Sequence, residues 1–209
     1  GNVNFALGPL AASFMLKRIL TDTLKVAPRL AISAVVRETS AIVEGVLQGI
    51  FDFAICSANT LKSEGGIDVI SLASFPMGMF VRSGHPLLSL NRDVEWNDLI
   101  PYPRITGRYP QHRRLDAGLP FGPLDTTVEC NDFEVLRAIT LETDAIWLTA
   151  MAMLDGDERG GSLVSINPRP FHDLAIAEIV LVRQSERLLS PAAERVIQLI
   201  MTTTANFAK

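Results

Sequence analysis

The chain has 209 residues, of which 48% are apolar and 20% charged, and its formal net charge is −4. This length allows one large domain or two small ones with a buried core, and the composition is typical of a globular rather than a disordered protein. The acidic balance argues against an autonomous nucleic-acid-binding module, which needs a basic face. No apolar run approaches the roughly 20 residues of a membrane span, so no membrane partner is expected.

The cysteines and histidines form no recognisable metal-binding motif. Cys56, Cys130 and the three histidines show no CxxC, HxxxH or HExxH spacing, so no metal site is expected. Each cysteine ends an apolar strand pattern, which favours reduced core thiols, with a redox pair as the alternative.

The first 60 residues alternate between strand and helix patterns. The apolar spacing predicts strands at residues 3–7, 30–36 and 52–55 and helices at residues 10–26 and 40–48. Gly8-Pro9 ends the first strand, and Gly49 closes the second helix. This order predicts parallel strands joined by right-handed crossovers.

The remaining elements are more widely spaced. Strands are predicted at residues 67–72, 77–82, 126–130, 145–148 and 176–182, and helices at residues 96–100, 133–142, 149–154 and 191–204. Phe75-Pro76 separates the first two of these strands, and residues 101–123 are read as mostly loop because they are rich in proline. Asn131 or Asp132 is expected to cap one helix, and Ser190-Pro191 to open the last.

The elements group into two lobes. The first is expected to combine residues 1–72 with residues 172–209, and the second to comprise residues 73–171. In sheets of parallel strands, ligands gather at the carboxyl ends of the strands, beside helix N-termini that carry a partial positive charge. Such places follow four predicted strands, at residues 8–11, 39–40, 131–133 and 149–150.

Hydroxyl and guanidinium groups near these ends are the candidate ligand-binding groups. Thr39 and Ser40 could bond a carboxylate or hydroxyl group, with a plain helix cap as the alternative role for Ser40. Arg108 could grip a carboxylate in a two-pronged contact. The competing interpretation of the arginines at 104, 108, 113 and 114 is a solvated loop, while Asp132 would repel an anion or accept from a ligand hydroxyl.

Motifs for catalysis are absent. The sequence contains no G-x-S-x-G elbow, no P-loop and no G-x-G-x-x-G, and the histidines have no nucleophile of predictable proximity. His85 lies in a turn before proline, which favours a structural role. We expect a protein that is not an enzyme and has no cofactor.

Several short motifs, in order, resemble the effector-binding domain of LysR-type transcriptional regulators. They are Gly8 with its following helix and Pro28, Thr39-Ser40 through Gly49-x-x-Asp52, Gly84-His85-Pro86-Leu87, and Leu188-Leu189-Ser190-Pro191-Ala192-Ala193. The resemblance runs nearly end to end. Two departures lie beside the expected cleft: Glu142-Thr143-Asp144-Ala145 replaces a common Gly-x-Gly, and Thr149 stands where many relatives have proline.

The resemblance implies an α/β fold of two Rossmann-like lobes joined by two crossover strands, similar to type II periplasmic binding proteins. It also implies a small-molecule effector in the cleft between the lobes, plausibly a carboxylate, contacted by Thr39-Ser40 and by Arg108 after Thr106-Gly107. The predicted effector-binding residues are Pro9, Leu10, Ala11, Thr39, Ser40, Ser57, Ala58, Thr106, Gly107, Arg108, Asn131, Asp132, Phe133 and Thr149.

The resemblance further implies a cytoplasmic homodimer or homotetramer. DNA would be bound only through an N-terminal winged helix-turn-helix that these residues do not include, and RNA polymerase is a further partner that the family allows. In such dimers, residues 10–26 and 30–36 would meet the partner's residues 111–130. The alternatives are a periplasmic solute-binding protein of a transport system, which shares the architecture, and a small α/β enzyme.

Overall fold

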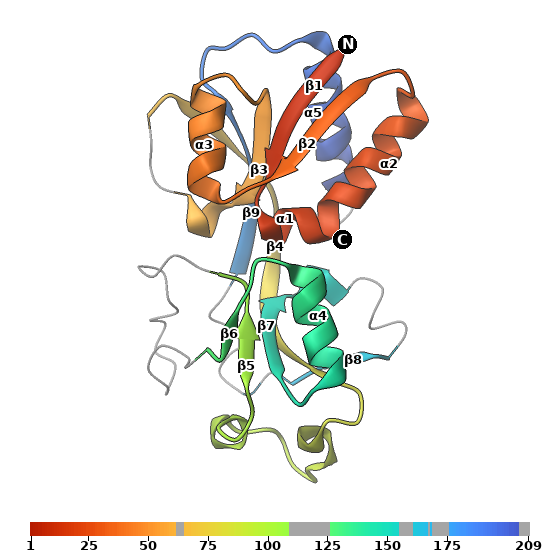
Figure 1. Ribbon diagram of the computed structural model, residues 1–209, viewed down its shortest axis with the longest axis vertical. Coiled ribbons are helices and arrows are strands. Elements are labelled where there is room, and N and C mark those ends of the chain that lie inside the picture. Colours follow the sequence, from red (N-terminus) through yellow and green to blue (C-terminus); the bar gives the residue numbers. More distant parts are fainter. Residues whose placement is uncertain (62–64, 109–125, 155–160, 167, 169–175, 205–209) are drawn as a thin grey trace. The chain divides into compact units, whose positions relative to one another are not determined.

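The computed structural model describes residues 1–61, 65–108, 126–154, 161–166, 168 and 176–204 (Figure 1). The chain divides into two compact units. Unit 1 comprises Gly1–Ser74 with Glu178–Lys209, and unit 2 comprises Phe75–Ala177. Two neighbouring strands, β4 (Ile67–Arg82) and β9 (Ile176–Gln184), each have residues in both units.

Unit 1 contains the three parallel strands that the sequence predicts. They are β1 (Asn2–Leu7), β2 (Ala31–Val36) and β3 (Phe53–Ser57). The sheet order is β2-β1-β3-β9, with β2 and β3 parallel to β1 and β9 antiparallel to β3. The carboxyl ends of β1, β2 and β3 therefore lie at one edge.

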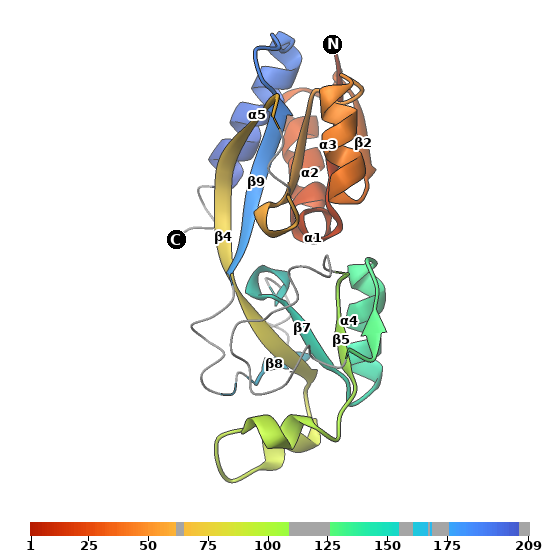
Figure 2. The ribbon, with the colours of Figure 1, turned by 90° about the vertical axis from the view of Figure 1, so that its left-hand side faces the viewer.

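The core of unit 1 follows from the alternation of side chains along these strands. The helix α3 (Thr39–Leu47) buries Ile42 and Val46. They join one cluster with residues from three strands, namely Ala6, Ala54, Cys56, Val180 and Val182. Phe5 and Phe53 stack on the other face of the sheet, with ring centroids 5.0 Å apart. The helices α3 and α5 cover opposite faces of this sheet (Figure 2).

The predicted helix at residues 10–26 is continuous but not uniform. It consists of α1 (Pro9–Ala11), a π-helical segment (Ala12–Leu16) and α2 (Lys17–Val26). The last helix, α5 (Pro191–Thr204), packs against α2 and β1. Its start is confirmed, because Ser190 Oγ accepts a hydrogen bond of 3.2 Å from the backbone N–H of Ala193.

Unit 2 is built on the second half of β4. The other strands are β5 (Arg104–Thr106), β6 (Val128–Glu129), β7 (Ile146–Ala150) and β8 (Leu163–Ser165). β5 lies between β6 and β7 and is parallel to both, while β7 and β8 pair antiparallel with β4. The helix α4 (Phe133–Glu142) packs against β7, where the rings of Phe133 and the fully buried Trp147 lie 6.3 Å apart.

The structure differs from the sequence analysis in three details. Residues 67–72 and 77–82 form one strand rather than two, because Pro76 is exposed between buried Phe75 and Met77 and its fixed φ suits an extended chain. Within the predicted loop 101–123, residues 104–106 form β5. β8 was not predicted. Strands of three residues carry too little periodicity to be recognised before their partners are known.

Smaller differences concern where elements begin and end. The strand predicted at residues 126–130 is shortened to β6. The short helix at 96–100 is the 3₁₀ turn Trp96–Leu99. β7 continues through Thr149 and Ala150, so the predicted helix at 149–154 is only the 3₁₀ turn Met151–Leu154. Thr149 is consequently a strand residue and not a helix start.

Candidate functional site

In unit 1, polar residues gather where β2 and β3 end. Thr39 begins α3 after β2, and Thr60 ends the 3₁₀ turn Ala58–Thr60 after β3. Their hydroxyl oxygens lie 2.6 Å apart, and Thr60 Oγ1 donates a bond of 2.8 Å to the carbonyl oxygen of Ser57. The structure thus joins the predicted residues Thr39 and Ser57 through Thr60, which the sequence analysis did not single out.

The start of α3 is open to a ligand. Its N-cap position is Glu38, whose side chain makes no capping bond, so the cap role considered for Ser40 is wrong. Ser40 is exposed, and its hydroxyl has no hydrogen-bond partner among the described residues. The N–H groups of the first helical turn have no partner within the helix and favour an anion or a carbonyl oxygen.

The segment after β1 contributes less than predicted. The side chains of Leu10 and Ala11 are buried in the core, and only Pro9 is partly exposed. Ser57 is also buried, while Ala58 is partly exposed. Among the predicted residues in this part of unit 1, the polar side chains that a solute can reach are therefore those of Thr39 and Ser40.

In unit 2, the carboxyl ends of β5, β6 and β7 share one edge because the strands are parallel. The backbone N–H of Arg108 donates a bond of 2.9 Å to Asn131 Oδ1. Thr106 is buried, and its hydroxyl donates a bond of 3.0 Å to the carbonyl oxygen of Leu148. These bonds link the ends of all three strands.

Asp132 caps α4, as predicted. One of its carboxylate oxygens, Oδ1, accepts bonds of 3.1 Å from the backbone N–H groups of Glu134 and Val135. The carboxylate is exposed and leaves Oδ2 available to a donor. Its negative charge opposes an anion at this position and favours a hydroxyl or amino group.

Phe133 and Gly107 belong to the packing beneath this edge. The side chain of Phe133 is buried, and a Cβ atom added to Gly107 would lie 2.9 Å from Phe133 Cζ. A larger residue at position 107 would therefore displace the ring. Both residues shape the backbone around Arg108, and the buried Phe133 ring offers no accessible face to a ligand.

Thr149 is buried without a hydrogen bond. Its side chain is 0% exposed, and Oγ1 has no partner among the described residues. The residue lies in β7 opposite Gly78 of β4. A buried hydroxyl without a partner costs free energy, and a solute cannot reach this side chain in the structure.

The predicted arginines have different environments. Arg104 lies in β5 and donates to the carbonyl oxygen of Leu99 at 3.4 Å. Arg108 is exposed, and no carboxylate among the described residues lies within salt-bridge distance of it. Arg113, Arg114 and Asp116 lie outside the described residues. Among the described candidate arginines, Arg108 is thus the one with an exposed guanidinium at this edge.

His85 and Cys56 are buried as core residues, whereas Cys130, also predicted as a core thiol, is partly exposed, and His112 and His172 lie outside the described residues. His85 is fully buried: Nδ1 accepts from the backbone N–H of Leu87 at 3.1 Å, and Nε2 lies 3.2 Å from the carbonyl oxygen of Asp144. Cys56 and Cys130 are both free thiols. Burial raises the pKa of Cys56 to about 12, so its thiol stays protonated and unreactive at neutral pH. The described residues contain no group of three or more metal-ligating side chains.

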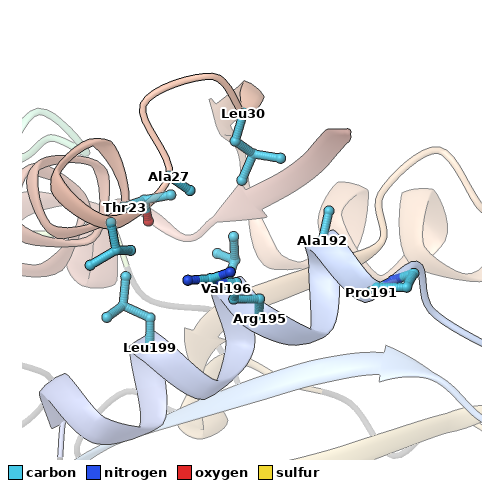
Figure 3. A pocket seen from close by; sticks show the side chains of 9 residues that line it. Thr23, Ala27, Leu30, Pro191, Ala192, Arg195, Val196 and Leu199 are labelled. Carbon is cyan, nitrogen blue, oxygen red and sulfur yellow. The ribbon is translucent and has the colours of Figure 1, made fainter.

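A separate groove in unit 1 holds none of the predicted effector-binding residues (Figure 3). It has a volume of about 280 Å³ and runs between α2 and α5. Its lining residues are Thr23, Val26, Ala27, Leu30, Pro191, Ala192, Arg195, Val196 and Leu199. Thr23 uses its hydroxyl within its own helix, on the carbonyl oxygen of Ile19. The groove is nearly all apolar and does not suit a polar effector.

Comparison with known proteins identifies the family. The model of the LysR substrate binding domain matches residues 1–205, and the chain belongs to this family. It is 24% identical to the SDS degradation transcriptional activation protein of Pseudomonas sp. and 25% identical to the HTH-type transcriptional regulator GbpR of Azospirillum brasilense. These matches cover 98% and 92% of this chain and 68% and 57% of the two relatives.

Solved structures share the fold at low sequence identity. The effector binding domain of QuiR in complex with shikimate has a TM-score of 0.75 at 15% identity, covering 100% of this chain and 99% of that one. The regulatory domain of CcmR from Synechocystis, in complex with 2-PG, has a TM-score of 0.78 at 16% identity and full coverage of both chains. The CrgA regulatory domain of Neisseria meningitidis has a TM-score of 0.79 at 12% identity, covering 98% of each chain.

These findings confirm the predicted family and the type II periplasmic-binding-protein-like fold. The chain is the effector-binding domain of a LysR-type transcriptional regulator, and the family consists of regulatory domains rather than enzymes. The transport and enzyme alternatives are thereby set aside. Within the described part of the chain, no helix is long and apolar enough to cross a membrane.

Proposed function

We propose that a small-molecule effector binds at the carboxyl ends of the parallel strands, where each unit offers one candidate set of residues. The first set is the start of α3 with Thr39 and Ser40. The second is the edge of unit 2 with Arg108 and Asp132. The observation that carries the proposal is that exposed polar groups collect at the carboxyl ends of the parallel strands in both units, where such sheets hold ligands.

The charges of these groups suit an effector that carries both an acid and a hydroxyl. Arg108 and the first-turn N–H groups of α3 favour a carboxylate or a similar anion. Asp132 instead favours a hydrogen-bond donor. Shikimate, which is bound in the QuiR structure, is a hydroxylated carboxylate and combines the two features.

The proposed consequence of binding is a change in DNA binding by the full-length regulator. An effector that prefers one arrangement of the protein shifts the population toward it by its differential affinity. In the proposed scheme the domain works in a cytoplasmic homodimer or homotetramer, reads DNA through an N-terminal helix-turn-helix and contacts RNA polymerase. No cofactor takes part.

A metabolite screen tests the proposal. Thermal shift against a panel of hydroxy acids, simple carboxylates and neutral sugars identifies binders, because a ligand of the folded state raises the melting temperature. Calorimetry then compares the best binder on the wild type and on the double variant Thr39→Ala with Ser40→Ala. We expect a loss of roughly tenfold or more in affinity without loss of folding.

Thr202→Ala provides the matched control. Thr202 is an exposed threonine on α5 in the same unit and far along the chain from the strand ends. Its removal should leave the affinity unchanged. Equal affinity of the wild type and the double variant would remove Thr39 and Ser40 from the site.

A further inference from the structure

Three groups near the end of β3 form a chain of hydrogen bonds with a fixed direction. Thr39 Oγ1 lies 2.6 Å from Thr60 Oγ1, and Thr60 Oγ1 donates to the carbonyl oxygen of Ser57 at 2.8 Å. We infer that Thr60 turns Thr39 into a hydrogen-bond acceptor toward the effector, so that the site selects a molecule with a hydroxyl or amino group at that point. This inference rests on the proposed function.

The direction follows from counting protons. A threonine hydroxyl carries one hydrogen and two lone pairs, whereas a backbone carbonyl can only accept. Thr60 uses its hydrogen on Ser57, so the hydrogen between the two threonines must come from Thr39. Thr39 Oγ1 then has no hydrogen left for a ligand and keeps its lone pairs.

Thr39 is partly exposed, so those lone pairs are accessible to a solute. A ligand hydroxyl can donate to them without disturbing the chain of bonds. A ketone or carboxylate oxygen placed there would meet lone pairs with no hydrogen between, unless the bond from Thr60 to Ser57 broke. A hydrogen bond of this kind contributes about 1 kcal/mol, which is roughly fivefold in affinity.

The neighbouring hydroxyl, that of Ser40, can still donate a hydrogen bond to a ligand. Ser40 has no partner among the described residues, so its hydroxyl can donate as well as accept. An acidic group is therefore expected at Ser40 and the first-turn N–H groups of α3. A donor group is expected at Thr39. Two adjacent residues thereby read two different functional groups, and Thr60 is the positioning residue that separates their roles.

The hydrogen bond between Thr39 and Thr60 also supports the local structure, and the test must separate this support from ligand selectivity. It joins the start of α3 to the turn after β3, and its loss would loosen both. Thr60→Ser keeps the hydroxyl and the chain of bonds. Thr60→Val keeps the shape and removes the hydroxyl. Only the second variant frees the hydrogen of Thr39, so the pair distinguishes selectivity from support.

Neutron diffraction of deuterated crystals locates the hydrogens without any ligand. The deuteron of Thr39 should point to Thr60 Oγ1, and that of Thr60 to the oxygen of Ser57. A Thr39 deuteron that points elsewhere overturns the inference. Lactate and pyruvate, which differ only by a hydroxyl and a ketone at one carbon, then probe selectivity by chemical-shift titration of the ¹⁵N-labelled protein.

We expect the wild type and Thr60→Ser to prefer lactate by roughly fivefold, and Thr60→Val to lose this preference. If Thr60→Val keeps the wild-type preference for lactate, the role of Thr60 is contradicted but the proposed site is not. If the double variant of Thr39 and Ser40 binds both probes as the wild type does, the proposed site itself is wrong. If neither probe shifts a resonance, the deuteron positions alone decide whether Thr39 is an acceptor.

Discussion

The backbone N–H of Arg108 and the side-chain Oδ1 of Asn131 are joined by a hydrogen bond of 2.9 Å. Arg108 follows β5 and Asn131 follows β6, so the bond ties together the ends of two neighbouring strands. The Arg108 backbone is thereby fixed while its guanidinium stays exposed. An arginine held at its base loses less conformational freedom when it grips a ligand.

Arg108→Ala should weaken an acidic effector more than a neutral one. The wild-type guanidinium offers a charged bond worth about 1.5–3 kcal/mol, so the acidic binder should lose roughly tenfold to a hundredfold in affinity. Calorimetry with one acidic and one neutral binder measures the difference. Arg29→Ala, which removes an exposed arginine in unit 1, is the control. Equal losses for both ligands would contradict a charge role for Arg108.

Asp132 offers a pair of variants that separate its cap from its charge. Asp132→Ala removes the acceptor for Glu134 and Val135 and should lower the free energy of unfolding by about 1 kcal/mol. Asp132→Asn keeps an acceptor oxygen and should lose little stability. It should also bind an acidic effector more tightly, because a negative charge is gone. Urea denaturation and calorimetry measure the two effects, and weaker binding of the acid by Asp132→Asn would count against the proposed repulsion.

His85 should be needed for stability rather than binding. Because Nδ1 accepts from Leu87, the hydrogen is on Nε2 and is donated to the carbonyl oxygen of Asp144. His85→Ala removes this partner from the buried N–H of Leu87 and from the partly buried carbonyl oxygen of Asp144, and it should cost roughly 2–4 kcal/mol. His85→Asn retains a cap acceptor and should cost less. Denaturation midpoints compare the two variants. If His85→Ala is as stable as the wild type, the proposed structural role of His85 is wrong.

Cys56 should resist thiol reagents in the folded protein. Its pKa is raised to about 12 by burial, so little thiolate exists at pH 8, whereas Cys130 is partly exposed. One thiol should react quickly with a maleimide in the native state, and both in denaturant. Rapid modification of two thiols without denaturant would contradict the burial of Cys56.

The same thiol should make stability depend on alkaline pH. The unfolded thiol ionises near the ordinary value of 9.0 and the folded one near about 12. The folded state therefore keeps a proton that the unfolded state releases. The contribution of this thiol to the free energy of unfolding is fully present below pH 9 and is lost as the pH rises from about 9 to about 12. Cys56→Ala should show a smaller loss over that range in urea denaturation.

The elements with local chemical signals were predictable from the sequence. The helix at residues 133–142 has the predicted bounds because a capping aspartate fixes its start, and Ser190-Pro191 marks α5 in the same way. β5 and β8 could not be predicted, since strands of three residues are defined by their neighbours in the sheet. Pro76 led to the prediction of two strands instead of one. A proline interrupts a strand only at a position where the sheet needs a backbone N–H donor.

For the candidate site, the sequence predicted which chain segments take part but not which of their side chains. The carboxyl ends of the strands follow from the order of elements, which placed Thr39 and Arg108. Thr60 was missed because its role depends on a contact with a residue 21 positions earlier in the chain. A polar residue soon after the third predicted strand, on the same sheet edge, was the available signal. Leu10 and Ala11 were included because a strand end says nothing about which side chains turn into the core.

Unit 2 is one uninterrupted stretch of polypeptide, whereas unit 1 is assembled from both ends of the chain. On a ribosome, all of unit 2 emerges before β9 has delivered Val180 and Val182 to the cluster beneath α3. Until then, β3 lacks its antiparallel neighbour, and the cluster around Ala6, Ile42 and Ala54 lacks its contribution from β9. A premature stop codon just before β9 would release a product in which the edge of β3 is unpaired, and such an edge promotes aggregation.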